Sequence, residues 1–204
     1  MSKCLKEPYG FELGIGSCWP PNTISQILFY DTFTGENGTA LSAHTPDTDI
    51  RGNGWDDING GLEIQSNKAT AAAGASYKYS VVDAEESDVE IEVDFTAGSY
   101  DWVPVRYVDE DNQWLVQARG ANTEWRLYKI DGGDTTQMDN GGTVAVGNTY
   151  AVKIVCSGNS INVYVDDELT LSTSNAFNAS ATKHGIMRAS TGTASVFDNF
   201  KITG

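Results

Sequence analysis

With 204 residues, 40% of them hydrophobic and 20% charged, the chain has the composition of a globular protein and enough length for one full core. Its net charge of −15, from 28 acidic and 13 basic residues, argues against binding to a nucleic-acid backbone, which needs clustered Lys and Arg. No segment approaches the roughly 20 apolar residues of a membrane-spanning helix.

Residues 1–26 are predicted to form an irregular N-terminal arm, because Gly and Pro recur throughout them. The arm is nevertheless too apolar for a solvated tail, since it contains Tyr9, Phe11, Leu13, Ile15 and Trp19. We therefore expect it to dock on a surface, either its own domain or a neighbouring subunit. Charges and prolines also interrupt any signal-peptide pattern, so synthesis without export is expected.

The chain contains three cysteines. Cys4 and Cys18 either pair within the arm or remain reduced, and the absence of a secretory signal favours reduced thiols. Cys156 lies on an alternating strand and is expected to be a small buried hydrophobic residue.

Residues 27–204 are predicted to form one β domain. Short alternating runs are separated by turn signals such as Asn59-Gly60-Gly61 and Asp131-Gly132-Gly133, and no helical period is visible. This pattern predicts an all-β, two-sheet antiparallel jelly-roll sandwich. The expected strands are 27–33, 54–58, 62–65, 68–72, 76–81, 87–95, 102–109, 112–119, 123–130, 149–156, 160–165, 168–173, 183–189 and 194–203.

Three strands in the middle of the domain, 102–109, 112–119 and 123–130, combine aromatic residues with Arg and Gln. An exposed aromatic face can stack on a sugar ring while the planar polar groups hydrogen-bond its hydroxyls. The same aromatic residues are good strand formers and core residues, so we expect at least half of them to be buried in the core. The candidate carbohydrate-binding residues are Trp102, Arg106, Gln117, Arg119, Trp125, Arg126 and Tyr128.

Residues 149–173 show the clearest strand pattern, with three short alternating strands and two tight turns. Gly158 and Asn159 tolerate the backbone angles of the first turn, and Asp166-Asp167 forms the second. Such regular alternation indicates an antiparallel sheet with one buried face.

Several segments, taken in order, resemble the concanavalin A-like, or laminin-G-like, jelly rolls. The similar segments are Phe29–Phe33 with Gly38–Leu41 and His44–Asp47, then Gly54-Trp55 and Gly61–Ile64, then Val105–Asp109 with Asn112–Trp114, then 149–173, and finally Ala194–Ile202. The resemblance covers about 175 residues from Phe29 onward and implies a fold that hosts lectins, carbohydrate-binding modules, glycosidases, lyases, adhesins and viral coat components. The opening pattern FxDxFxxxxGTxL is similar to that of phage structural proteins and bacterial surface proteins.

The resemblance also implies a structural Ca²⁺ where the first and last strands lie side by side. Asp31 and Asp198 fall on these strands, and carboxylates are the ligands that this cation prefers. The alternative is that both residues cap turns or remain solvated. Asp47, Asp49, Asp56 and Asp57 form a second acidic loop cluster with the same alternatives.

Glu90, Glu92 and Asp94 are the main candidates for catalysis, because an i, i+2, i+4 spacing places all three carboxylates on one face of a strand. Laminarinase-type jelly-roll glycosidases use three carboxylates at this spacing, but in the order Glu-x-Asp-x-Glu. The alternative is a solvated acidic face opposite a buried one. The two histidines, His44 and His184, lie in no nucleophile motif.

These observations predict a non-catalytic, virion-associated structural or adhesion protein, a capsid decoration or tail appendage assembled in the host cytoplasm, with a lectin-like face. The expected partners are capsid or tail subunits, through the arm, and glycans; neither nucleic acid nor membrane is expected. A homo-oligomer is left open; a closed trimer would suit a virion appendage, and only the general preference of proteins for symmetric assemblies supports oligomerisation. The alternatives are a stand-alone lectin or carbohydrate-binding module, and a glycoside hydrolase that uses Glu90, Glu92 and Asp94.

Overall fold

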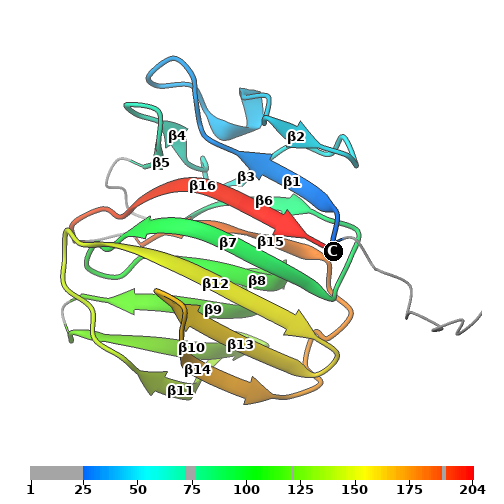
Figure 1. Cartoon of the computed structure of the whole chain (residues 1–204), viewed down its shortest axis with the longest axis vertical. Helices are drawn as coiled ribbons and strands as arrows, with labels where there is room; N and C mark the ends of the chain where they lie inside the picture. Colours follow the sequence, from blue (N-terminus) through cyan, green and yellow to red (C-terminus); the bar gives the residue numbers. More distant parts are fainter. Residues whose placement is uncertain (1–24, 72–76, 121, 190–191) are drawn as a thin grey trace, which may run out of the picture.

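The computed structural model describes residues 25–71, 77–120, 122–189 and 192–204, and these form two antiparallel sheets packed face to face (Figure 1). Sheet A has the order β14 (Glu168–Ser174), β13 (Ser160–Val165), β12 (Thr149–Ser157), β7 (Val89–Thr96), β16 (Val196–Thr203), β1 (Ile27–Asp31) and β2 (Thr48–Asp49), and β4 (Glu63–Ile64) and β5 (Ala69–Thr70) join it at β16. Sheet B has the order β11 (Asp134–Gly141), β10 (Glu124–Asp131), β9 (Asn112–Arg119), β8 (Trp102–Asp109), β15 (Lys183–Arg188), β6 (Lys78–Asp83) and β3 (Asp56–Ile58). One 3₁₀ turn, η1 (Leu41–Ala43), is the only helical element among the described residues. The all-β sandwich predicted from the sequence is confirmed.

The three strands β12, β13 and β14 form the meander that the alternation predicts. Val152 pairs with Val165 and Ile154 with Val163, so the apolar side of one strand faces that of the next. Asp166 and Asp167 turn the chain between β13 and β14 with φ angles of 50° and 67°. Positive φ at both positions is typical of the tight hairpin turns whose twist matches that of the strands.

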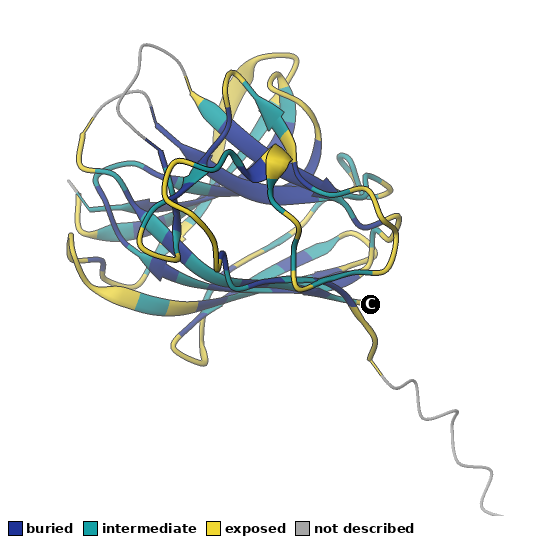
Figure 2. Ribbon diagram, turned by 90° about the horizontal axis from the view of Figure 1, so that it is seen from above, coloured by how far each residue is buried: buried dark blue, intermediate teal, exposed yellow. Residues whose placement is uncertain are grey.

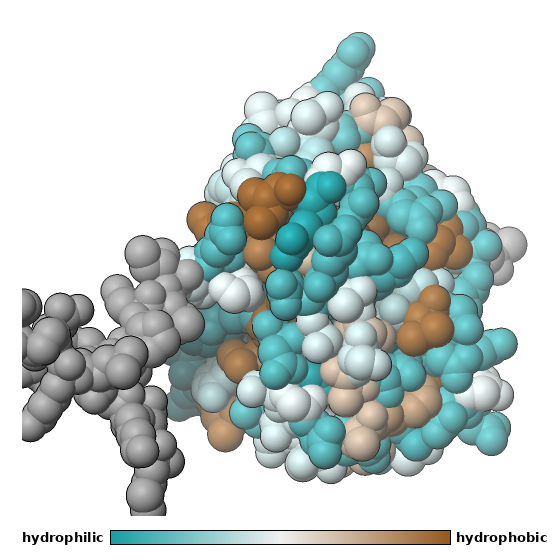
Figure 3. Space-filling view, turned by 90° about the vertical axis from the view of Figure 1, so that its right-hand side faces the viewer, coloured by the Kyte–Doolittle hydropathy of each residue, from teal (hydrophilic) through white to brown (hydrophobic). Residues whose placement is uncertain are grey.

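The core lies between the two sheets and is rich in aromatic residues. Figure 2 shows that buried residues follow the strands of both layers and that exposed residues concentrate on the connecting loops. Phe95 contacts Phe197 edge-on with 4.9 Å between ring centroids, and Phe29 contacts Trp55 in the same way at 5.0 Å. Cys156 belongs to this core with 2% exposure, as the sequence predicts. On the side of the molecule in Figure 3, hydrophobic surface residues form small separate patches among hydrophilic ones.

The edge strands β11 and β14 lie against each other and close one side of the sandwich. The Ser172 backbone N–H, on β14, donates to Asp139 Oδ2, on β11, over 2.8 Å. The sequence pattern did not predict β11, because most of its side chains are exposed and it has no alternation of polar and apolar residues. It also missed the two-residue strand β2.

The predicted arm, with Cys4 and Cys18, lies outside the described residues except for Ser25 and Gln26. Gln26 pairs with Gly204 through two backbone hydrogen bonds of 2.9 and 3.0 Å, so the described chain begins and ends at neighbouring positions. No helix in the described ranges is long and apolar enough to cross a membrane.

Candidate functional site

Strand β8 contains a bulge that decides which of its side chains reach the outer face of sheet B, the face turned away from the core. Its pairing with β9 changes register between Val105 and Asp109, and Arg106 has a φ of 48°. Beyond the bulge Tyr107, rather than Arg106, joins the hydrophobic cluster of the outer face. Arg106 is fully buried, and its Nη2 lies 3.4 Å from both Ser87 O and Asp88 Oδ1. The prediction that Arg106 contacts a sugar is therefore wrong.

Trp125 is also unavailable to a ligand. It is 1% exposed and lies in the core between Phe95 and Tyr150, with ring centroids at 5.6 and 5.5 Å. Alternation along β10 then turns its neighbours Arg126 and Tyr128 to the opposite, outer face. Trp125 as a sugar contact is the second wrong assignment.

The structure brings the other five predicted residues together on the outer face of sheet B. Trp102, Gln117 and Arg126 form one row across β8, β9 and β10, since Gln117 pairs with both of the others. Next to this row is a hollow of about 250 Å³. Its lining consists of Tyr100, Trp102, Gln117, Arg119, Tyr128 and Thr135. The sequence pattern missed Tyr100, which lies in a loop, and Thr135, which lies on the unpredicted strand β11.

Aromatic rings supply the apolar side of the site. Trp102 lies between Tyr77 and Tyr128, with ring centroids at 5.8 and 6.3 Å, and is nearly parallel to Tyr128 at 26°. Beneath these rings the outer-face cluster is held by Leu115 and Met187, which are both fully buried. The rings therefore rest on a fixed apolar layer and need little reordering to stack on a ligand.

Some polar groups of the site have hydrogen-bond partners within the protein, and others have none among the described residues. Arg126 forms an ion pair with Glu124 and donates to the Tyr128 hydroxyl over 2.9 Å. The hydrogen bonds that Arg126 donates to the Tyr128 hydroxyl and to Glu124 raise the pKa of Arg126, and the Arg126 side chain lowers the pKa of Glu124. By contrast, Trp102 Nε1, Gln117 Oε1 and Arg119 Nε are buried and have no hydrogen-bond partner among the described residues. Buried polar atoms without partners are rare in folded proteins, and these three adjoin the hollow.

The predicted metal ligands Asp31 and Asp198 have other partners in the structure. Asp31 is fully buried and accepts hydrogen bonds from Phe33 N and Trp55 Nε1, each over 2.7 Å. Asp198 forms an ion pair with Lys68 at 3.2 Å. Within the described residues no group of three or more His, Cys, Asp or Glu side chains is arranged to hold a metal ion. Calcium binding at this pair stays a prediction.

The second acidic cluster predicted from the sequence, Asp47, Asp49, Asp56 and Asp57, makes hydrogen bonds and an ion pair within the domain. Asp47 accepts hydrogen bonds from the backbone and hydroxyl of Thr32, and these bonds lower its pKa. Asp49 accepts three backbone N–H groups between Arg51 and Gly54. Asp57 contacts the Ser80 hydroxyl, and Asp56 forms an ion pair with Lys183 at 3.6 Å.

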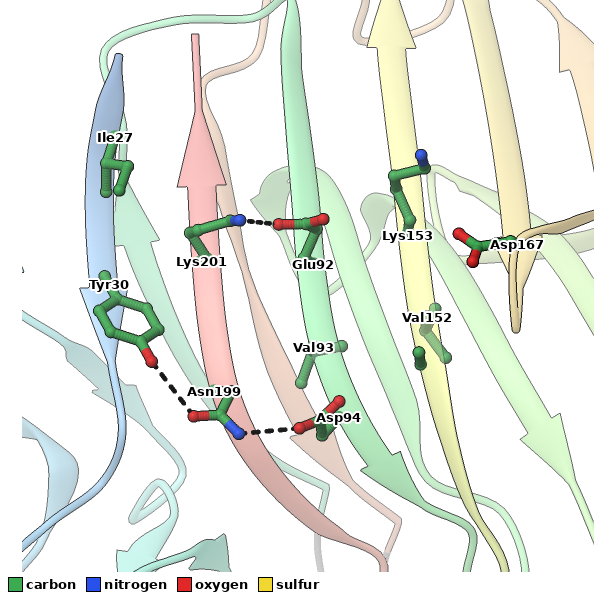
Figure 4. A pocket seen from close by; sticks show the side chains of 11 residues that line it. Ile27, Tyr30, Glu92, Val93, Asp94, Val152, Lys153, Asp167, Asn199 and Lys201 are labelled. Carbon is green, nitrogen blue, oxygen red and sulfur yellow. Dashed lines mark hydrogen bonds and ion pairs between the residues drawn. The ribbon is translucent and has the colours of Figure 1, made fainter. Parts of the chain in front are cut away.

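The candidate catalytic carboxylates lie on β7, at the outer face of sheet A, and therefore on the other side of the molecule from the sheet B hollow. Glu92 and Asp94 line a hollow of about 370 Å³ (Figure 4). Glu92 forms an ion pair with Lys201, and Asp94 accepts a hydrogen bond of 2.8 Å from Asn199, which in turn accepts one from Tyr30. Glu90 does not belong to the lining.

No family model matches the chain, and no curated protein matches its sequence. Solved structures do match its fold. Carbohydrate-binding module CBM66 from Bacillus subtilis has a TM-score of 0.59 at 17% identity, over 74% of this chain and 95% of that one. The domain has the concanavalin A-like jelly-roll fold.

Two further neighbours of this concanavalin A-like domain carry glucanase names. A non-specific endo-β-1,3(4)-glucanase of family GH16 has a TM-score of 0.61 at 8% identity, over 89% of this chain and 92% of that one. An immunostimulatory antigen and pseudo β-1,3-glucanase of Mycobacterium tuberculosis has a TM-score of 0.56 at 11% identity, over 87% and 98%. At these identities the likeness concerns the fold alone, and function must be argued from the two outer faces.

Proposed function

We propose that this chain is a non-catalytic glycan-binding protein that holds a sugar on the outer face of sheet B. The observation that carries the proposal is the hollow beside Trp102 and Tyr128, where aromatic rings adjoin the polar side chains of Gln117 and Arg119. A sugar ring has apolar C–H faces and a rim of hydroxyls, so it needs this pairing of rings with planar hydrogen-bonding groups. The unpartnered Trp102 Nε1 and Gln117 Oε1 offer a donor and an acceptor for such hydroxyls.

The size of the hollow suits a small ligand unit. Its volume of about 250 Å³ lies below the roughly 300–1,000 Å³ of pockets that enclose drug-sized molecules. An open hollow of this size fits one or two residues of a longer glycan that continues across the sheet. The fold neighbour that is itself a carbohydrate-binding module supports this function.

The lining of the hollow also favours binding over hydrolysis. Most glycosidases place two carboxyl groups about 5–9.5 Å apart on either side of the scissile bond. The residues that line the sheet B hollow include no Asp or Glu. On sheet A, Glu92 forms an ion pair with Lys201, and Asp94 accepts a hydrogen bond from Asn199. These contacts are typical of a solvated acidic surface.

The test measures binding of the whole chain to an array of neutral and acidic glycans, followed by affinity measurements on the glycans that bind. Trp102→Ala is expected to weaken binding by about tenfold or more, because it removes a central aromatic contact. Tyr164→Ala is the matched control and should leave affinity unchanged, since Tyr164 lies on β13 of the opposite sheet, where it contacts Lys153 of β12. A wild-type chain that binds no glycan on the array would refute the proposal.

The same preparation decides the glycosidase alternative. Wild-type chain incubated with a panel of β-glucans is expected to release no reducing sugar. Hydrolysis that disappears in Glu92→Gln would replace the binding function with an enzymatic one.

The place of the protein on a virus particle stays a prediction, and so does docking through residues 1–26. Deletion of that segment, followed by sedimentation with purified particles, tests both. The virion role predicts loss of particle association while glycan binding is retained.

A further inference from the structure

We infer that the sheet B hollow recognises an acidic saccharide, a glycan whose sugar carries a carboxylate or sulfate group. This inference rests on the proposed glycan binding and adds the charge class of the ligand. It follows from the charge of the hollow, from the partners of Arg119 and from the geometry of the guanidinium group.

The hollow carries a local charge opposite to that of the protein. Arg119 is the single charged residue among those that line it. The chain as a whole has a net charge of −15, so its general surface repels anions. The positive charge of Arg119 beside the aromatic rings of this hollow therefore contrasts with the net charge of the chain.

Arg119 forms no salt bridge within the described residues, although acidic side chains are abundant. Eight other Lys and Arg residues do so: Arg51, Lys68, Arg106, Arg126, Lys129, Lys183, Arg188 and Lys201. The contacts of Arg119 are instead neutral, namely the Tyr128 hydroxyl at 3.5 Å from Nη1 and the Tyr100 ring at 5.9 Å from the guanidinium carbon. Its Nε is buried and has no partner.

The acidic residue that pairs with Arg119 in the sheet has other hydrogen-bond partners. Glu124 faces Arg119 across β9 and β10 in the register of the sheet. Both oxygens of that carboxylate are already engaged, one by Arg126 and the other by Asn140 Nδ2 over 3.1 Å. The main partner of Glu124 is thus Arg126, and Arg119 remains the positively charged residue that lines the hollow.

A guanidinium group suits an oxyanion better than it suits a hydroxyl. Its N–H groups form a planar fork that matches carboxylate and sulfate oxygens, and such charge-assisted hydrogen bonds are about twice as strong as neutral ones. Gln117, buried to 3% exposure beside Arg119, fixes the position of the remaining sugar hydroxyls through its unpartnered Oε1. The aromatic rings then hold the sugar ring while Arg119 selects its charge.

The test compares acidic and neutral forms of the same glycans. Glycans bearing uronic acid, sialic acid or sulfate are arrayed beside neutral ones, and each one that binds is remeasured after carboxyl reduction or desulfation. We expect the acidic form to bind about tenfold more tightly or better, with an affinity that falls as NaCl is raised. The separate uronate and sulfate arms show which anion is preferred.

Arg119→Gln is expected to bring the affinity for the acidic form down to that for the neutral form, without loss of neutral binding. Lys153→Gln is the matched control, because it removes one positive charge from the outer face of sheet A, beside Tyr164. Thermal unfolding of each variant confirms that it is folded.

Neutral glycans bound as tightly as acidic ones by the wild type would overturn this inference and leave the glycan-binding function standing. Loss of neutral binding in Arg119→Gln would also overturn it, since the arginine would then only shape the hollow. If the wild type binds neither acidic nor neutral glycans, the glycan-binding function itself is refuted.

Discussion

Asp31 is the side chain whose replacement best separates a structural role from the predicted calcium site. Its carboxylate is fully buried and receives the Phe33 N–H and the Trp55 Nε1–H, each over 2.7 Å, while His44 Nε2 lies 3.0 Å from Oδ1. In Asp31→Asn one of the two oxygens becomes an NH₂ group, which cannot accept. At least one buried donor is then left without an acceptor.

The expected loss of stability follows from that single change. A buried polar group without a partner costs about 1–3 kcal/mol, so Asp31→Asn is expected to lower the free energy of unfolding by about 2 kcal/mol. For a domain of this size that corresponds to a decrease in Tm of about 4–8 °C. Asp31→Ala removes every acceptor and should cost more. Urea denaturation at 25 °C, followed by tryptophan fluorescence, measures both variants.

Asp198→Asn is the matched control, because Asp198 pairs with a partly exposed Lys68 and such surface pairs contribute about 0–1 kcal/mol. An Asp31→Asn variant within about 0.5 kcal/mol of the wild type would refute the hydrogen-bond argument. All three proteins are also unfolded with Ca²⁺ and with a chelator. A rise in Tm with Ca²⁺ that both Asn variants lose would establish the predicted metal site instead.

Two further predictions concern buried titratable groups. Burial lowers the pKa of His184 to about 4, whereas the unfolded chain binds the proton near 6.5, so the free energy of unfolding should fall by about 3 kcal/mol as the pH is lowered from 7 to 4. His184→Gln should flatten this part of the urea-denaturation profile, and an unchanged slope would contradict the assignment. Burial raises the pKa of the Cys156 thiol to about 11, so a thiol reagent at pH 8 should modify Cys156 only in denaturant. Peptide mass spectrometry that finds rapid modification of Cys156 in the native chain would disprove this.

The sheet pairing could be predicted where side chains alternate strictly. In β12 and β13 every second residue is apolar, so the buried face, the turns and the fate of Cys156 all follow from the sequence. In β11 Met138 is the single large apolar residue, and the strand depends on the neighbouring β10, with which it pairs from Trp125 to Asp131. Local pattern carries no information of that kind, so only the tertiary structure reveals the strand.

The site was predicted in part for the same reason. Trp102, Gln117 and Tyr128 reach the outer face because inward- and outward-pointing side chains alternate without interruption along their parts of β8, β9 and β10. Arg106 does not, because the backbone bulges at this residue, which has a positive φ, and Tyr107 reaches the outer face in its place. Nothing in the local sequence pattern from Val105 to Tyr107 predicts that bulge. Trp125 shows a different limit, since aromatic residues suit both a core and a binding face, and only alternation relative to Arg126 separates the two.

The contact between β11 and β14 has a consequence for self-association. A free strand edge is the usual place where a second copy adds its own strand to a sheet. Here the Ser172 N–H of one edge is held by the Asp139 carboxylate, and the opposite edges end in strands of only two and three residues, β2 and β3. The described part of the domain therefore offers almost no free strand edge to which a second copy could add a strand. If copies of this protein associate, we therefore expect contacts between faces or loops of the described domain rather than pairing of strand edges.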